Sequence, residues 1–220
     1  MPVIKAIVTA GGTSRRFGVG NKLLENLNGK PVIKYSVDLF TEMGFEVIIP
    51  AHHSFIPEME ELFKDYSNVR IIQGGLTRQQ SVYRGLKTAE WCDYVIIHDG
   101  ARPLIKRETV EKCLEKAYEK RAAIVAVHTT DTIKTVDMHK KITGTPLRTN
   151  LVNVQTPQIF DYRLILDAHE SHLECSMTDD SCLVEAYGTD VYYVEGEYSN
   201  IKITNQIDMD YAKLLLESHL

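Results

Sequence analysis

The chain has 220 residues, of which 44% are hydrophobic and 25% charged, and its formal net charge is −5. This composition predicts one globular α/β domain over residues 1–220, whose core needs no disulfide or metal to stabilise it. No apolar run approaches the roughly 20 residues of a membrane span, and no basic stripe follows an expected element, so we expect neither a membrane nor a nucleic-acid partner. The N-terminus enters a strand without a signal-peptide pattern, which favours a cytoplasmic location.

The first motif is a glycine-rich turn that follows an apolar stretch, Val3 to Val8, typical of a buried strand. The turn runs Ala10-Gly11-Gly12-Thr13-Ser14-Arg15-Arg16, and Lys22 follows it. Glycine lets backbone amides approach an anion, and the basic side chains supply positive charge. The spacing matches neither a dinucleotide fingerprint nor a Walker loop. The turn therefore indicates a polyphosphate site at a sheet edge, with an ordinary βα turn bearing solvated basic residues as the alternative.

Strands and helices alternate from this turn to residue 127. We expect helices over residues 31–43, 57–66, 78–89 and 106–120, and strands over 45–50, 69–73, 94–98 and 122–127. Thr77 suits the N-cap position of the third helix. This alternation favours a Rossmann-like, doubly wound, mostly parallel sheet, in which the carboxyl ends of the strands gather at one edge.

Two of these strands deliver polar residues to that edge. Gly74-Gly75 opens a second glycine turn, and Arg78 and Ser81 lie one helical turn apart after it. Asp99 and Arg102 follow the strand at 94–98. An acid and a base at a strand end can hold a charged or metal-bound ligand from two sides, although a structural Asp–Arg pair that fixes the turn is the alternative reading.

Residues 129–153 break the alternation and predict a projecting β-hairpin arm, with 130–134 leading out and 145–148 returning. A two-stranded hairpin is marginally stable alone, so we expect the arm to form a symmetric homodimer. The chain then continues with a strand at 154–160, a helix at 162–172, a capped helix at 178–187, a strand at 191–195 and a last helix from 208 to 216.

Several residues suggest packing rather than chemistry. His98 follows an apolar strand and is expected to be a hydrogen-bonded core residue, the other histidines carry no expected role, and Trp91 is expected to pack. The four cysteines form no C-x-x-C pair and are expected to be free thiols. They are Cys92, Cys113, Cys175 and Cys182.

The motifs, taken together and in order, resemble the 2-C-methyl-D-erythritol 4-phosphate cytidylyltransferase family over essentially the whole chain. They are Ala10-Gly11-Gly12 with Arg15-Arg16, Asn21-Lys22, Gly74-Gly75 with Arg78 and Ser81-Val82, His98 to Pro103, Asp131 to Lys134, Gln155 to Gln158, Thr178-Asp179-Asp180 and Asn200 to Thr204. The resemblance implies an enzyme that joins CTP to a sugar-alcohol phosphate, giving 4-diphosphocytidyl-2-C-methyl-D-erythritol and pyrophosphate for isoprenoid synthesis.

The resemblance also implies a role for each matching residue. Lys22, Arg16 and Lys202 would be catalytic. The CTP site would comprise Ala10, Gly11, Gly12, Ser14, Arg15, Arg16, Lys22, Gly75, Arg78 and Ser81. The sugar-phosphate site would comprise Asp99, Arg102, Thr132, Arg148, Thr156 and Lys202, with Thr132 and Arg148 reaching from the arm into the partner's site. Mg²⁺ would accompany the triphosphate, and Asp99 would contact it directly or through water.

The chain departs from the family pattern at Ser14 and Asn21, where glycine and proline are common, and at Leu76, where an acid is frequent. The main alternative function is that of a ribitol-5-phosphate cytidylyltransferase, which shares the fold and the nucleotide. A non-enzymatic nucleotide-binding protein is a further alternative. An NAD-dependent oxidoreductase is disfavoured because Pro50-Ala51-His52 stands where an acid would be needed.

Overall fold

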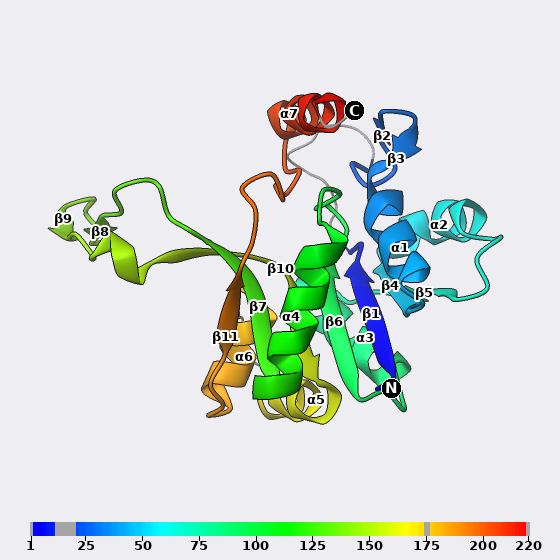
Figure 1. Ribbon diagram of the computed structural model, residues 1–220, viewed down its shortest axis with the longest axis horizontal. Helices are drawn as coiled ribbons and strands as arrows, with labels where there is room; N and C mark the ends of the chain where they lie inside the picture. The colour runs from blue at the N-terminus through cyan, green and yellow to red at the C-terminus, as the bar shows by residue number, and fades with distance from the viewer. Residues whose placement is uncertain (1, 12–20, 174–176, 219–220) are drawn as a thin grey trace.

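A seven-stranded sheet forms the centre of the computed structural model, which describes residues 2–11, 21–173 and 177–218 (Figure 1). The strand order is β11-β7-β10-β6-β1-β4-β5. Their bounds are β1 Ile4–Thr9, β4 Glu46–Ala51, β5 Val69–Gln73, β6 Tyr94–Asp99, β7 Ala122–His128, β10 Val152–Asp161 and β11 Tyr192–Glu195. Only β10 runs antiparallel to its neighbours in this sheet. The expected doubly wound, mostly parallel sheet is confirmed.

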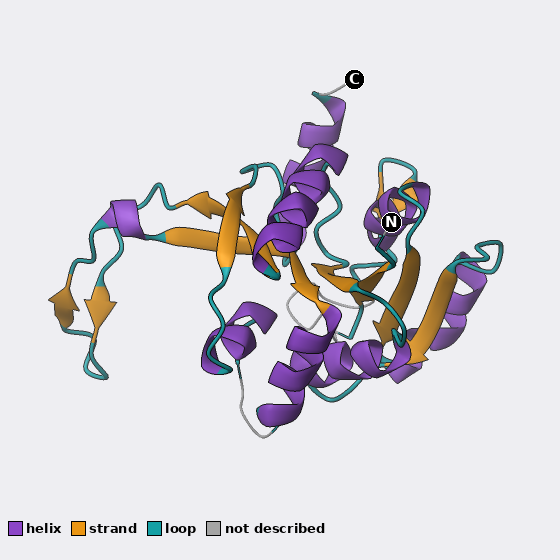
Figure 2. Ribbon diagram, turned by 60° about the horizontal axis from the view of Figure 1, so that its bottom comes forward, coloured by secondary structure: helices purple, strands orange, loops and turns teal. Residues whose placement is uncertain are grey.

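Helices cover both faces of the sheet (Figure 2). They are α1 Val32–Glu42, α2 Ile56–Leu62, α3 Arg78–Thr88, α4 Arg107–Lys120, α5 Tyr162–Ser171, α6 Asp180–Ala186 and α7 Gln206–Glu217. Side chains alternate along β1, because Ala6 and Val8 join the core that contains Phe40 of α1, whereas Ile7 joins the core that contains Val82 of α3. Each face of the sheet therefore has its own apolar core.

The order of strands β1, β4, β5 and β6 in the sheet indicates where a ligand can bind. The chain passes from β1 outward to β4 and β5 and then returns to β6 on the other side of β1. In open α/β sheets, ligands bind at such a switch point, outside the carboxyl ends of the strands. Ala10 and Gly11 follow β1, and Asp99 ends β6, so both expected motifs lie at this point.

Most expected elements are present within a few residues of their predicted ends, and Thr77 caps α3 by accepting from the Gln80 amide. A short hairpin, β2 Asn26–Leu27 with β3 Lys30–Pro31, was not predicted. Trp91 was expected to pack, but it is 90% exposed because it lies in the surface turn between α3 and β6. Cys92, Cys113 and Cys182 are free thiols, as expected.

The segment between β7 and β10 projects from the sheet, at the left of Figure 1. It carries an antiparallel pair, β8 Thr135–Val136 with β9 Ile142–Gly144. The segments expected to lead out and return, 130–134 and 145–148, are not themselves strands, and Arg148–Asn150 forms a short 3-10 helix. The pairing lies further out because the Asp137 carboxylate accepts from the amides of His139 and Lys141 and so fixes the tip of the turn.

The expected roles of Gly12, Ser14, Arg15 and Arg16 and the thiol of Cys175 lie outside the described residues. Within the described ranges, no helix has the length and apolar character to cross a membrane.

Candidate active site

The two glycine turns meet at Ser81. The Ser81 hydroxyl accepts from the Gly75 amide at 3.0 Å and donates to the carbonyl of Thr77 at 2.9 Å. A Cβ on Gly11 would lie 2.8 Å from Ser81 Oγ, so a side chain at position 11 would clash with it. Ala10 donates its amide to the Pro50 carbonyl at 3.1 Å, which ties the end of β1 to β4. The fold thus brings Ala10, Gly11, Gly75 and Ser81 together, as expected for one nucleotide site.

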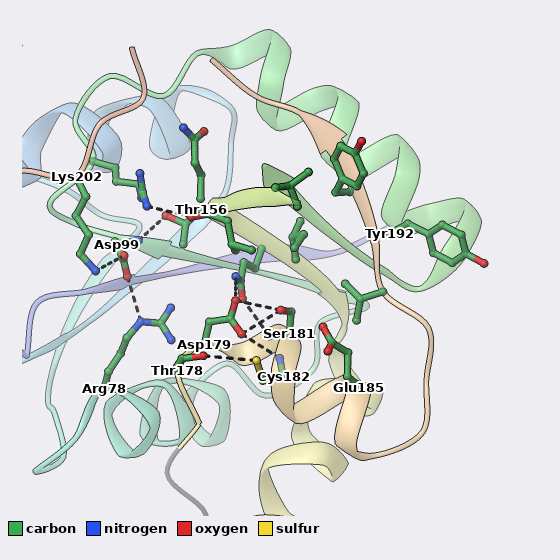
Figure 3. Close-up of a pocket in the computed structure, with 18 residues that line it drawn as sticks. Arg78, Asp99, Thr156, Thr178, Asp179, Ser181, Cys182, Glu185, Tyr192 and Lys202 are labelled. Atoms are coloured by element: carbon green, nitrogen blue, oxygen red, sulfur yellow. Dashed lines mark hydrogen bonds and ion pairs between the residues drawn. The ribbon is translucent and has the colours of Figure 1, made fainter. Parts of the chain in front are cut away.

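Asp99 lies between two cationic side chains at the end of β6 (Figure 3). Lys202 Nζ donates to Asp99 Oδ2 at 2.7 Å, and Arg78 Nε donates to Oδ1 at 3.1 Å. Burial alone would raise the pKa of Asp99, but the charges of Arg78 and Lys202 outweigh it and hold that pKa well below its usual range. Asp99 is therefore an ionised anchor that fixes both cations.

Thr156 and His98 support Asp99 from behind. Thr156 Oγ1 accepts from the Asp99 amide at 3.0 Å and lies 3.1 Å from His98 Nδ1, while His98 Nε2 lies 3.0 Å from the Arg102 carbonyl. The Thr156 hydroxyl can thus donate to Nδ1, which leaves the imidazole proton on Nε2 to bind the carbonyl. Burial lowers the pKa of His98 to about 4. The prediction that His98 is a hydrogen-bonded core residue is confirmed.

The segment at 200–204 brings the two lysines to the same end of the sheet. Ile203 donates its amide to the Ala101 carbonyl at 2.8 Å, which places Lys202 beside Asp99. Lys22 Nζ donates to the Ile203 carbonyl at 2.7 Å. Lys22, Asp99 and Lys202 are 77 or more residues apart in sequence, yet hydrogen bonds connect them. Lys22 bonds to the carbonyl of Ile203, and the neighbouring Lys202 bonds to Asp99.

A pocket of about 510 Å³ opens beside Asp99. Arg78, Arg102, Thr156 and Lys202 line it together with Asp99. Side chains of β10, β11, α6 and the α6 N-cap line the rest of the pocket, among them Val152, Asp179, Ser181, Cys182, Glu185, Tyr192 and Tyr193. The resemblance implies that Arg78 belongs to the nucleotide site. In the structure, the Arg78 guanidinium lies among the residues expected for the sugar phosphate, because Arg78 is the first residue of α3 and its Nε reaches Asp99.

The family model for 2-C-methyl-D-erythritol 4-phosphate cytidylyltransferase matches residues 4–218. The chain belongs to this family. It is 38% identical over 97% of its length to the enzyme of that name from Clostridium botulinum, of which 99% is covered. It is 41% identical over 97% of its length to the one from Caldanaerobacter subterraneus, of which 98% is covered.

Solved structures agree with this assignment. The 4-diphosphocytidyl-2C-methyl-D-erythritol synthase of Anaerococcus prevotii superposes with a TM-score of 0.88 at 32% identity, and 98% of this chain and 99% of that one are covered. The cytidylyltransferase of Thermus thermophilus superposes with a TM-score of 0.83 at 29% identity, with 99% and 100% covered. This cytidylyltransferase is therefore a nucleotidyltransferase of isoprenoid synthesis, and the family match favours methylerythritol phosphate over ribitol phosphate as its acceptor.

Sequence reasoning missed two residues behind the cytidylyltransferase pocket. Asp180 is 1% exposed, and its Oδ2 accepts from Arg78 Nη1 at 2.6 Å. His169 is fully buried and its Nε2 lies 3.1 Å from Asp180 Oδ1. The sequence marked Asp180 as part of a helix start and of the Thr178-Asp179-Asp180 motif but assigned it no role in the site, and nothing in the sequence joins positions 78, 169 and 180. Burial of Leu183 and Val184 on α6 turns Asp180 inward, which only the packing reveals.

The arm residues of the cytidylyltransferase lie apart from this pocket. Thr132 and Arg148 are exposed, and Arg148 Nη1 donates to the Thr130 carbonyl at 3.0 Å. Neither residue lines the described pocket of the same copy. Within one copy, then, the structure does not bring these two expected substrate residues to Asp99.

Proposed function

We propose that Lys22 and the glycine turns bind the triphosphate and cytosine of CTP, and that the pocket beside Asp99 binds the phosphate of 2-C-methyl-D-erythritol 4-phosphate. The observation that carries this proposal is the link from Lys22 through the Ile203 carbonyl to Lys202 and Asp99. This link supports binding of the two anionic substrates side by side at the end of the sheet. Arg16 and the other basic residues of the first turn belong to the same proposed CTP site.

The reaction then needs charge compensation and alignment rather than a protein nucleophile. An oxygen of the sugar phosphate attacks the α-phosphorus of CTP in line, the new P–O bond forms, and the bond from the α-phosphorus to the bridging oxygen breaks, releasing pyrophosphate. Both reactants are anions that repel each other. Lys22 and Lys202 offset this repulsion and hold the reacting atoms in line, which is where such enzymes gain most of their rate.

The described residues offer no protein cage for Mg²⁺. They contain no group of three His, Cys, Asp or Glu side chains that could hold an ion, and both carboxylate oxygens of Asp99 already accept from cations. Direct ligation of the metal by Asp99 does not fit this arrangement. We therefore assign Mg²⁺ to the triphosphate oxygens, where it would offset phosphate charge.

A homodimer through the arm would complete the site. Exposed apolar side chains follow the arm, which favours its packing on a second copy. They are Ile133, Val136, Met138, Ile142 and Leu147. In such a dimer, Thr132 and Arg148 of one copy would contact the sugar phosphate in the other.

The test measures pyrophosphate release with CTP and either methylerythritol phosphate or ribitol 5-phosphate, for the wild type and Lys202→Met. We expect turnover with methylerythritol phosphate, and a loss of about 100-fold in kcat/KM for Lys202→Met, the order seen when a charge-stabilising donor is removed. Lys116→Met, at a half-buried lysine paired with Glu119 on α4, is the control and keeps wild-type activity. Turnover of ribitol phosphate alone, or full activity of Lys202→Met, would contradict the proposal.

A further inference from the structure

A row of buried polar groups runs from α5 to the pocket. His169 Nε2 lies 3.1 Å from Asp180 Oδ1, Asp180 Oδ2 accepts from Arg78 Nη1 at 2.6 Å, and Arg78 Nε donates to Asp99 Oδ1 at 3.1 Å. The His169 and Asp180 side chains are 0% and 1% exposed. We infer that His169 is a positioning residue for the cytidylyltransferase reaction: it orients Asp180, which in turn fixes the Arg78 guanidinium for the sugar phosphate.

The geometry defines the chemical role of His169. Its Nδ1 is buried and has no hydrogen-bond partner among the described residues. A proton on Nε2 alone lets the ring donate to Asp180 and leaves only an acceptor unpaired. His169 therefore offers its Nε2 as the donor that orients the Asp180 carboxylate.

Asp180 uses its two oxygens for different partners. With Oδ1 engaged by His169, Oδ2 faces Arg78. The charge of Arg78, together with the hydrogen bond from His169, lowers the pKa of Asp180 although burial alone would raise it. Asp180 is then a fixed anion behind the pocket, and a charge-assisted hydrogen bond of this kind is stronger than a neutral one.

Arg78 is thereby held by carboxylates on two sides. Its contacts with Asp99 and Asp180 use Nε and one N–H of Nη1, so other N–H groups of the guanidinium remain for an anion in the pocket that Arg78 lines. Loss of the His169 donor would free Asp180 to rotate and loosen one of the two anchors. The inference rests on the proposed function, because it needs the sugar phosphate to bind beside Arg78.

His169 also packs, so the test must separate its donor from its volume. Its ring stacks on Tyr83 of α3 with the centroids 6.2 Å apart and the planes at 16°. His169→Met and His169→Gln form a matched pair, since both side chains are of equal length but only Gln offers an N–H near the position of Nε2. His172→Met, one turn further along the chain and outside the row, is the control for α5.

The experiment measures kcat, KM for each substrate and the thermal midpoint of these variants. We expect His169→Met to raise KM for methylerythritol phosphate about tenfold, the order expected when one supporting charge-assisted hydrogen bond is lost. KM for CTP stays within about twofold, because the nucleotide contacts are elsewhere. His169→Gln restores KM for the sugar phosphate to within about threefold of wild type, and His172→Met matches wild type.

Two results would overturn the inference. If His169→Met and His169→Gln raise KM equally, the packing of the ring matters and the donor does not. If neither changes KM, His169 has no role in positioning. If His169→Met fails to fold, Asp180→Asn is measured alone and in combination with His169→Gln. If Asp180→Asn leaves KM for the sugar phosphate unchanged, the proposed positioning of Arg78 through Asp180 is refuted. Lys202→Met, measured alongside, distinguishes the two proposals, because an unchanged kcat/KM for the sugar phosphate there refutes the sugar-phosphate site itself.

Discussion

The buried imidazole of His98 makes the stability of the protein depend on pH in a defined window. His98 is fully buried, and burial lowers its pKa to about 4, against an ordinary value of 6.5. The unfolded chain therefore binds a proton at His98 between these two values while the native protein does not. By linkage, this group costs no stability above pH 6.5, and the free energy of unfolding falls as the pH drops from 6.5 toward 4.

The size of the effect follows from the shift. A pKa difference of 6.5 against about 4 corresponds to about 3 kcal/mol when fully expressed, since one unit is about 1.4 kcal/mol. Most of this, about 2 to 3 kcal/mol, is already lost at pH 4.5. This loss of unfolding free energy exceeds the change that Asp99 contributes between pH 6.5 and pH 4.5. A carboxylate whose pKa is lowered on folding loses its stabilising effect only as the pH falls below the pKa of the unfolded group.

Urea unfolding at pH 7.5, 6.5, 5.5 and 4.5 measures the effect in the wild type and in His98→Gln, at one protein concentration. Glutamine can donate to the Arg102 carbonyl in place of Nε2 but does not titrate. We expect His98→Gln to be less stable than wild type at pH 7.5, and this difference to shrink by about 2 kcal/mol by pH 4.5. A difference that stays constant over the four pH values would refute the assignment of a neutral buried His98.

Two further predictions concern the dimer and the metal. Arg148→Glu and Lys22→Ala are each expected to be nearly inactive, but a randomly mixed sample should recover about a quarter of wild-type activity, because half of the dimers would contain one intact site. No recovery after verified subunit exchange would argue against an arm that acts across the dimer. Chelation of Mg²⁺ by EDTA should abolish pyrophosphate release yet leave the thermal midpoint unchanged, and a lowered midpoint would reveal a metal bound to the protein itself.

Local sequence signals fixed most elements because each depends on neighbours in the chain. The apolar run before Ala10 forms β1, and Thr77 caps α3 with its own hydroxyl. The polar residues at the ends of β1 and β6 could be placed together from topology alone, since parallel strands bring their carboxyl ends to one edge. The motif order supplied Lys202, which no local pattern connects to Asp99.

The failures share a different cause. The strand positions in the arm depend on how Asp137 binds the turn amides, and sequence periodicity does not report such contacts. Trp91 was expected to pack, although its place in a surface turn exposes it. The contacts of His169 and Asp180 follow only from the packing of α5 and α6 beside α3. No sequence pattern connects these two residues with each other or with Arg78.

The carboxylates explain how such a site can exist before its anions arrive. Arg78, Arg102 and Lys202 line one pocket, and cations this close would repel one another in the absence of substrate. Asp99 pairs with both Arg78 and Lys202, and Asp180 pairs with Arg78, which offsets this repulsion. In the proposed site, the cations would therefore hold their positions in the free enzyme, so that a phosphate would meet donors already in place and little binding energy would be spent on reorganisation. A site built from lysines and arginines alone would have to assemble around each substrate anew.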